Sequence, residues 1–193
     1  MRRALAIIAV LGVAAIVVLG LSQAGGTTSS ARAKPFDVDE ALRALEGAPA
    51  PIAALHRQAN DLLEGGPKTF RARLRELRGH PVVVNKWASW CGPCRTEFPI
   101  FQSEAVREGK RVAFVGVNAG DSLDPARRYL RATPLPFPSY LDPDEKIARE
   151  IRAPANYPIT VFVDAAGKTA FIHQGGYTSR QALSADIDRY LGA

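Results

Sequence analysis

The two cysteines of the chain are the residues whose type and spacing point most directly to chemistry. Cys91 and Cys94 are its only cysteines, and they stand where a predicted strand gives way to a predicted helix. A thiolate is the nucleophile in disulfide exchange, and the unpaired N–H groups and positive dipole end of a helix N-terminus favour a thiolate. Cys94, one turn further on, is placed to attack a mixed disulfide formed by Cys91 and release the reduced substrate. The pattern predicts a redox-active disulfide.

Two other interpretations of such a cysteine pair, a zinc site and a structural disulfide, have less support in the sequence. A zinc site usually needs four side-chain ligands, and the histidines His56, His80 and His173 are scattered singly, without the spacing of a ligand pair. A structural disulfide that closes so short a loop would restrict the unfolded chain little. We therefore predict no metal, and no cofactor other than the Cys91–Cys94 disulfide itself.

The length and composition favour one globular domain with additional segments. The chain has 193 residues, of which 47% are hydrophobic and 23% are charged, as in ordinary globular proteins. Its net charge of +6 is compatible with nucleic-acid binding, but the arginines are spread along the chain without an aromatic-basic stripe or a nucleic-acid-binding motif. We expect no nucleic-acid partner.

The N-terminal 21 residues have the composition of a membrane-spanning helix. Arg2 and Arg3 precede an uncharged apolar run at residues 4–21, which as a helix would span ~27 Å, close to the hydrocarbon thickness of a bilayer. The positive flank predicts a single-pass membrane protein with a cytoplasmic N-terminus and an extracytoplasmic domain, in a compartment where thiols tend to be oxidised. The alternative is a signal peptide cleaved after Ala24, which would give a secreted or periplasmic form.

Two segments separate this apolar run from the cysteines. Residues 22–34 are rich in Gly, Ser, Thr and Ala and have no hydrophobic period, which predicts a flexible tether. Residues 35–76 have apolar residues at helical spacing over three successive stretches, of which the second carries Leu62 and Leu63. We expect a helical segment here.

From residue 77 onward, strand patterns alternate with helix patterns. The expected strands cover residues 82–84, 112–117, 159–163 and 169–173. Helical patterns follow the first two strands and the final hairpin, and Thr178 with Gln181 has the spacing of a capping box for the last helix. This order predicts a three-layer α/β domain over residues 77–193.

The run Trp87-Ala88-Ser89-Trp90-Cys91-Gly92-Pro93-Cys94 resembles the active-site motif of thioredoxin-fold proteins, in particular the membrane-anchored TlpA- and ResA-like thiol:disulfide reductases. The resemblance extends over roughly residues 77–191. It implies a thioredoxin-like fold with a mixed central sheet. It also implies that Cys91 is the exposed attacking thiol and that Cys94 is the buried resolving thiol.

Glu97 matches the acidic residue that ResA-like proteins place beneath the cysteine pair. A partly buried carboxylate has a raised pKa, which suits it to accept the proton of Cys94 when that thiol attacks. The alternative is an exposed helix residue, because glutamates are mostly solvated. Asn85 stands where thioredoxins carry a buried aspartate, and an amide cannot exchange protons in that way, so Glu97 is the better acid–base candidate.

Tyr157 and Pro158 match the cis-proline loop that precedes the hairpin in the family. The resemblance implies a cis peptide bond at Pro158, whereas the residues alone also allow a trans proline that starts a strand. In the family the residue before this proline, here Tyr157, aligns a substrate strand by backbone hydrogen bonds. We expect Trp90, Gly92 and Pro93 to complete the substrate-binding surface, with Trp90 as its apolar rim.

The chain departs from the family in two places. Members of the family usually begin with a β-hairpin rich in Phe and Gly, whereas residues 35–76 here have helical spacing. Lys86 also replaces the usual aromatic residue before Trp87. We expect Lys86 to extend to the surface or to pair with a carboxylate, with Glu97 as the candidate.

These observations predict an extracytoplasmic thiol:disulfide oxidoreductase, attached to the membrane through its N-terminal helix, that reduces disulfides in other proteins. The resemblance implies apocytochrome c as a substrate and cytochrome c biogenesis as the setting. It also implies a membrane thiol transporter as the electron donor, because a fully oxidised enzyme cannot reduce anything. A disulfide-forming oxidase would use the same residues, since the direction depends on the reduction potential.

Two further functions are alternatives. A peroxiredoxin-like peroxidase shares the fold, but its chemistry requires a peroxidatic cysteine with a distant resolving partner. A non-enzymatic copper carrier favours Met or His beside the cysteines, and Met1 is the only methionine. Both patterns are missing from the sequence, so disulfide exchange is favoured.

Overall fold

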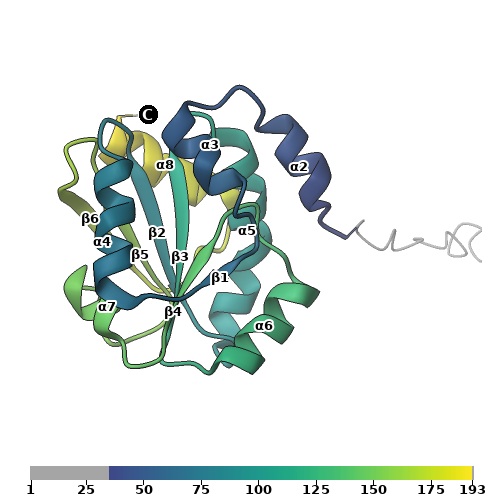
Figure 1. Cartoon of the computed structure of the whole chain (residues 1–193), viewed down its shortest axis with the longest axis vertical. Coiled ribbons are helices and arrows are strands. Elements are labelled where there is room, and N and C mark those ends of the chain that lie inside the picture. Colours follow the sequence, from purple (N-terminus) through teal and green to yellow (C-terminus); the bar gives the residue numbers. More distant parts are fainter. Residues whose placement is uncertain (1–34, 193) are drawn as a thin grey trace, which may run out of the picture. The chain divides into compact units, whose positions relative to one another are not determined.

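The computed structural model describes residues 35–192 (Figure 1). The expected membrane helix at residues 1–21 and the expected tether at residues 22–34 lie outside the described residues. Within residues 35–192, none of the helices combines the length and the apolar character that crossing a bilayer requires. From Phe36 onward the chain forms one compact unit, so the helical segment before residue 77 belongs to the same unit as the cysteines.

A mixed six-stranded sheet lies at the centre, with the strand order β1-β4-β3-β2-β5-β6. The strands are β1 (Leu62–Leu63), β2 (Val82–Trp87), β3 (Ala113–Ala119), β4 (Ser139–Asp142), β5 (Ile159–Val163) and β6 (Thr169–Gln174). Strands β1 to β4 are parallel to one another, whereas β5 runs antiparallel to β2 and to β6. Every residue of β2, β3 and β5 is buried, as the continuous apolar runs predict for strands covered on both faces.

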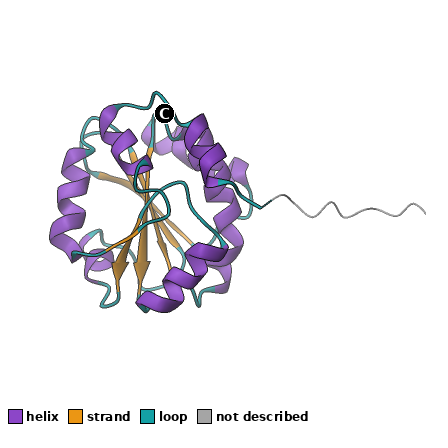
Figure 2. Ribbon diagram, turned by 45° about the vertical axis from the view of Figure 1, so that its right-hand side comes forward, coloured by secondary structure: helices purple, strands orange, loops and turns teal. Residues whose placement is uncertain are grey.

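Helices cover both faces of the sheet (Figure 2). They are α2 (Val38–Ala44), α3 (Ala50–His56), α4 (Gly66–Glu76), α5 (Gly92–Glu108), α6 (Leu123–Ala132), α7 (Lys146–Glu150) and α8 (Arg180–Leu191). One apolar cluster includes Phe98 of α5, Leu130 of α6 and Ile187 of α8. A second cluster, on the opposite face, includes Phe70 of α4 and Ile147 of α7. The expected three-layer α/β fold with a mixed sheet is confirmed.

Two strands, β1 and β4, were not predicted from the sequence. Leu62 and Leu63, which we expected in a helix, form β1 and pair with the start of β4. Asn60 just before them has a φ of 63°, which ends helical geometry there, and a two-residue strand is too short to show a period. Strand β4 has only four residues and follows closely after three prolines at 134, 136 and 138, which mask its pattern.

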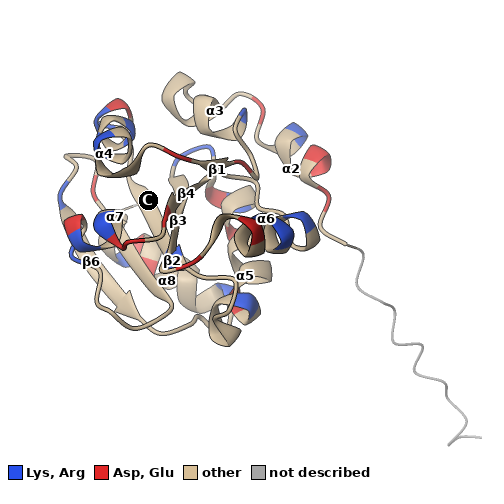
Figure 3. Ribbon diagram, turned by 60° about the horizontal axis from the view of Figure 1, so that its bottom comes forward, with Lys and Arg blue, Asp and Glu red and all other residues tan. Residues whose placement is uncertain are grey.

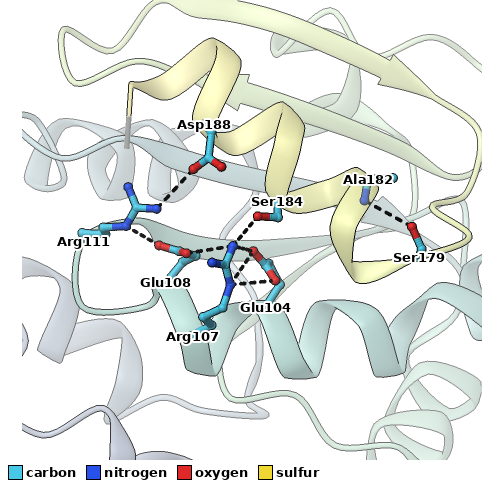
Figure 4. A network of polar contacts seen from close by, with 8 residues as sticks. All are labelled: Glu104, Arg107, Glu108, Arg111, Ser179, Ala182, Ser184 and Asp188. Atoms are coloured by element: carbon cyan, nitrogen blue, oxygen red, sulfur yellow. Dashed lines mark hydrogen bonds and ion pairs between the residues drawn. The ribbon is translucent and has the colours of Figure 1, made fainter.

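The C-terminal helix begins slightly later than expected. Ser179, rather than Thr178, is the N-cap of α8, and its hydroxyl oxygen accepts the N–H of Ala182 at 3.2 Å. Helix α8 packs beside α5, and a network of arginines and acidic side chains joins the two helices (Figure 4).

Charged residues gather on the helices and loops around the sheet, for example on α4 and α6 (Figure 3). Strand β2 is different, because the polar side chains of Asn85 and Lys86 are buried in it beside Trp87. Trp87 is followed by the loop that leads to Cys91. Two buried polar groups therefore lie next to the point where the redox motif leaves the sheet.

Candidate active site

Cys91 and Cys94 form a disulfide at the N-terminus of α5, with 5.3 Å between their Cα atoms. Cys91 is the N-cap residue, and its Sγ accepts the N–H of Cys94 at 3.1 Å. Pro93 occupies the first turn, where a missing N–H leaves no hydrogen bond unmade. Cys91 is 4% exposed and Cys94 is fully buried, so Cys91 is the more accessible sulfur, although it is not exposed in this disulfide form.

Glu97 lies one turn after Cys94 and is completely buried, so the alternative of an exposed helix residue is wrong. Its carboxylate accepts hydrogen bonds from Asn85 Nδ2 at 2.8 Å and from the N–H of Tyr177 at 3.1 Å. Burial raises the pKa of Glu97 to about 7, although both hydrogen bonds act in the opposite direction. Among the described residues, no basic side chain makes an ion pair with it.

The peptide bond between Tyr157 and Pro158 is cis, as the resemblance implies. Because β5 is antiparallel to β2, its first residue lies at the same sheet edge as the end of β2. The carbonyl oxygen of Pro158 accepts the N–H of Gly175 at 3.0 Å. A Cβ on the next residue, Gly176, would lie 3.5 Å from the carbonyl oxygen of Pro93 and 3.6 Å from Pro158. The proline loop and the cysteine helix are therefore neighbours.

Trp90 provides the apolar surface beside the disulfide. It is 60% exposed, and among residues 35–192 it is the one large hydrophobic side chain that is exposed. Its Nε1 donates to the carbonyl oxygen of Gly120 at 3.0 Å, and its ring packs edge-on against Tyr157 with 4.9 Å between ring centroids. The structure thus brings Trp90 and Tyr157 together and places the Pro158 loop beside the helix that begins after Cys91, although these residues come from two distant parts of the chain.

Lys86 pairs with a carboxylate, as expected, but its partner is Glu145 and not Glu97, and it does not reach the surface. Successive residues of a strand point to opposite faces of the sheet, and Asn85 already faces Glu97 and α5. Lys86 therefore points to the other face, where its Nζ makes an ion pair with Glu145 at 3.1 Å.

Asp121, which orders the loop before the cysteines, was not predicted from the sequence. Its carboxylate accepts the backbone N–H of Ser89 at 2.6 Å and that of Ser122 at 2.8 Å, and Asn118 Nδ2 donates to it at 2.9 Å. Burial alone would raise the pKa of Asp121, but these hydrogen bonds outweigh burial and hold the pKa below its usual value. Its place just after a parallel strand, at the carboxyl edge of the sheet, is the signal that could have indicated it.

No metal centre emerges from this part of the chain. Among residues 35–192, no group of three or more His, Cys, Asp or Glu side chains is arranged to hold a metal ion. The chemistry that these residues support rests on the two sulfurs, one buried carboxylic acid and an apolar rim.

The chain is similar in sequence and in structure to known proteins. ResA, a thiol-disulfide oxidoreductase of Bacillus subtilis, is 28% identical over 109 residues, which are 56% of this chain and 60% of ResA. The thiol:disulfide interchange protein DsbE of Yersinia pestis is 32% identical over 71% of this chain and 68% of its own length. The crystal structure of a DsbE-type protein of Chlorobium tepidum superposes with a TM-score of 0.56 at 30% identity, covering 62% of this chain and 85% of the other.

A family model also matches more than half of the chain. The model of the AhpC/TSA family matches residues 54–172, which include both cysteines and the cis-proline loop. The chain spans 60% of ResA and 50% of the DsbE of Xylella fastidiosa. The chain therefore belongs to the AhpC/TSA family and, within the thioredoxin superfamily, to the group of ResA- and DsbE-like proteins.

Proposed function

We propose that the protein is a thiol:disulfide oxidoreductase that reduces disulfides in other proteins. The observation that carries this proposal is the Cys91–Cys94 disulfide at a helix N-terminus, where Cys91 Sγ accepts a backbone N–H. A hydrogen bond and a helix dipole that favour the anion make Cys91 a good thiolate once the disulfide is reduced. The similarity to ResA and DsbE proteins supports the same activity.

The proposed reaction has two exchange steps. The Cys91 thiolate attacks one sulfur of the substrate disulfide, forms a mixed disulfide and releases the other substrate sulfur as a thiolate. The Cys94 thiolate then attacks Cys91 Sγ and releases the second substrate thiolate. The substrate gains two electrons and the enzyme ends as the Cys91–Cys94 disulfide, so a dithiol donor must reduce it before the next cycle.

Glu97 is the proposed proton acceptor for Cys94 in the second step. A pKa of about 7 lets the carboxylate take up a proton near neutral pH and return it later. Asn85 can hydrogen-bond to either protonation state of Glu97. Its Nδ2 donates to the carboxylate. Its Oδ1 has no hydrogen-bond partner among the described residues, and after the amide group rotates it can accept a hydrogen bond from the carboxylic acid.

Substrate binding is proposed on the surface around Cys91. An extended segment of the substrate would pair with the backbone at Tyr157, and the cis Pro158 keeps the chain close to the sulfurs without presenting an N–H. Trp90 would contribute apolar contact. Gly92 and Pro93 present backbone with little side-chain bulk to the approaching disulfide.

The proposed setting is extracytoplasmic. The apolar run at residues 4–21 would anchor the protein in the membrane or act as a cleaved signal. A membrane thiol transporter would supply the dithiol, and the family resemblance makes apocytochrome c the proposed substrate. A reduction potential as high as that of a disulfide-forming oxidase would contradict the reducing direction.

A Cys94→Ser variant tests the exchange mechanism. If Cys91 attacks first, this variant holds its substrates as mixed disulfides, which dithiothreitol releases and mass spectrometry identifies. A Cys91→Ser variant is the matched control and should trap none. Equal recovery from the two variants, or none from either, would contradict the proposal.

A peroxidase is the second candidate, since the matching family model is AhpC/TSA. Consumption of hydrogen peroxide by the reduced protein at a rate that exceeds its exchange with protein disulfides would favour it. The proximity of the two cysteines, three positions apart in one disulfide, supports disulfide exchange instead.

A further inference from the structure

Lys86 is a buried cation directly beneath the loop that leads to Pro158. Its side chain is 0% exposed, and an ammonium group in such a place needs partners to replace its hydration. The Nζ donates to the carbonyl oxygen of Pro154 at 2.9 Å and lies 3.1 Å from Glu145 Oε2. It also lies 3.9 Å from the centre of the Tyr157 ring, a cation–π contact.

All three partners belong to one short stretch of the chain. Glu145 is the N-cap of α7, and Pro154 and Tyr157 lie in the irregular loop between α7 and β5. Glu145 and Arg152 have φ values of 55° and 56°, which are unfavourable for residues other than glycine and persist only where surrounding contacts hold them. Lys86 supplies such contacts from the sheet side.

The same loop leads to the surface around the disulfide. The Tyr157 ring that covers Lys86 packs against Trp90, the residue before Cys91. In the sheet, Lys86 lies opposite Ile159, the residue after the cis proline. These contacts therefore link Lys86 to Trp90 through the Tyr157 ring, and strand pairing links it to the residue after the cis proline.

We propose that Lys86 is a positioning residue for substrate recognition: it holds the 153–157 loop in the geometry that binds an extended segment of a protein disulfide substrate. This inference rests on the proposed function. Lys86 makes no contact with the sulfurs among its described interactions, so it acts through Tyr157 and Pro154. Loss of Lys86 should therefore raise KM for protein substrates, which contact the loop, but not for small disulfides, which contact only Cys91.

A Lys86→Met variant separates recognition from chemistry. Methionine keeps an unbranched apolar chain but loses the ammonium group. With the full-length protein in detergent, we expect KM for insulin to rise about tenfold at nearly constant kcat, as for loss of a strong contact residue. The kcat/KM for 2-hydroxyethyl disulfide should stay within about twofold of wild type. Amide hydrogen exchange at 153–157 should be faster.

Two further variants make the test robust. Glu145→Gln keeps the side-chain shape and weakens one partner of Lys86, so it should raise KM for insulin about threefold, and it serves if Lys86→Met does not fold. Arg73→Met is the matched control. Arg73 of α4 is a largely buried cation, and its partners Gln58, Tyr140 and Glu76 lie outside residues 153–157. This variant should lose stability but keep its KM.

The outcomes distinguish this inference from the proposed function. An unchanged KM for insulin in both Lys86→Met and Glu145→Gln would overturn the positioning role, and so would an equal loss with insulin and the small disulfide. Failure of the proposed function would appear already in the wild type, as no exchange with either substrate.

Discussion

Helix α5 carries buried glutamates in two regions that differ in how their charge is compensated. Near its N-terminus, Glu97 lies one turn after Cys94, and the donors that reach it from residues 35–192 are both neutral, Asn85 and Tyr177. Near its C-terminus, Glu104 and Glu108 are also buried, but each makes ion pairs with arginine (Figure 4).

Of the two arginines at the second region, Arg107 belongs to α5 and Arg111 lies in the turn that follows this helix. Arg107 contacts both glutamates and Ser184 of α8, and Arg111 joins Glu108 to Asp188 of α8 at 3.4 Å. These contacts join α8 to α5 and place an arginine against each buried carboxylate. Because no such cation among the described residues pairs with Glu97, burial has the largest effect on its pKa and raises it. A pKa near neutral suits this carboxyl group to proton exchange. The C-terminal region of α5 therefore stabilises the packing of α8, whereas its N-terminal region carries the carboxyl group suited to catalysis.

The largest expected effect is on stability as a function of pH. The folded pKa of Glu97 is raised from 4.5 to about 7, so the folded state binds this proton more tightly than the unfolded state. Glu97 therefore contributes its full share to the free energy of unfolding below pH 4.5. This contribution falls as the pH rises, and by pH 7 it has decreased by about 3 kcal/mol. Glu97→Gln should remove this loss.

Urea unfolding of the oxidised protein at pH 5 and pH 8 measures the difference. We expect Glu97→Gln to be more stable than wild type at pH 8 and to lose that advantage at pH 5. Glu104→Gln should show no such crossover. If the difference in unfolding free energy between wild type and Glu97→Gln is the same at pH 5 and pH 8, the proposed contrast between the two regions is wrong.

The second effect is on the rate of exchange. Glu97→Gln should slow attack by Cys94 on the mixed disulfide about 100-fold near pH 7.5, the usual size of a general-base contribution. Quenched-flow analysis of a preformed mixed disulfide with a labelled peptide measures this step. The Glu104→Gln variant should resolve at the wild-type rate, and slowing in both variants alike would assign the effect to packing of α5.

The third effect concerns the C-terminal region of α5. Arg107→Met leaves Glu104 buried without its main cation, which should destabilise the protein by about 2 kcal/mol, less than for a fully buried pair because Arg107 is 43% exposed. Thermal unfolding gives the loss of stability, and the exchange rate should not change. A slower exchange reaction in this variant would show that the two regions are coupled.

The smallest effect tests the neutral donor at Glu97. Asn85→Leu removes a hydrogen bond that lowers the pKa of Glu97, so the midpoint of the pH–rate profile for resolution should move upward. Stopped-flow measurements from pH 5.5 to pH 9 give the midpoint. A downward shift would mean that Asn85 stabilises the carboxylic acid rather than the carboxylate.

The sequence predicted the parts of the site that depend on rare residue types in fixed spacing. Cys91 and Cys94 before a helix, and a proline before the hairpin, leave few structural solutions, and the cis bond at Pro158 is confirmed. Lys86 was assigned to the wrong carboxylate because its partner depends on which face of β2 it occupies. Asp121 was missed because an aspartate after a strand is common, and only tertiary structure brings Ser89 to it.

In the fold as well, long elements with a regular pattern were predictable and short ones were not. Long buried strands such as β3 show their pattern in sequence, whereas β1 has two residues and takes its structure from pairing with β4. The helices of residues 35–76 were predicted in type because their apolar spacing is regular. Short elements and polar partners are decided by contacts between distant parts of the chain, which a single sequence does not reveal.

The pKa of Glu97 is the most direct test of the account. In the full-length oxidised protein with ¹³C-labelled glutamate carboxyls, the Glu97 signal can be assigned by its loss in Glu97→Gln and followed by NMR from pH 4 to pH 9. We predict a titration midpoint near 7. A midpoint near 4.5 would show that the carboxylate is compensated after all and would contradict its role as the proton acceptor for Cys94.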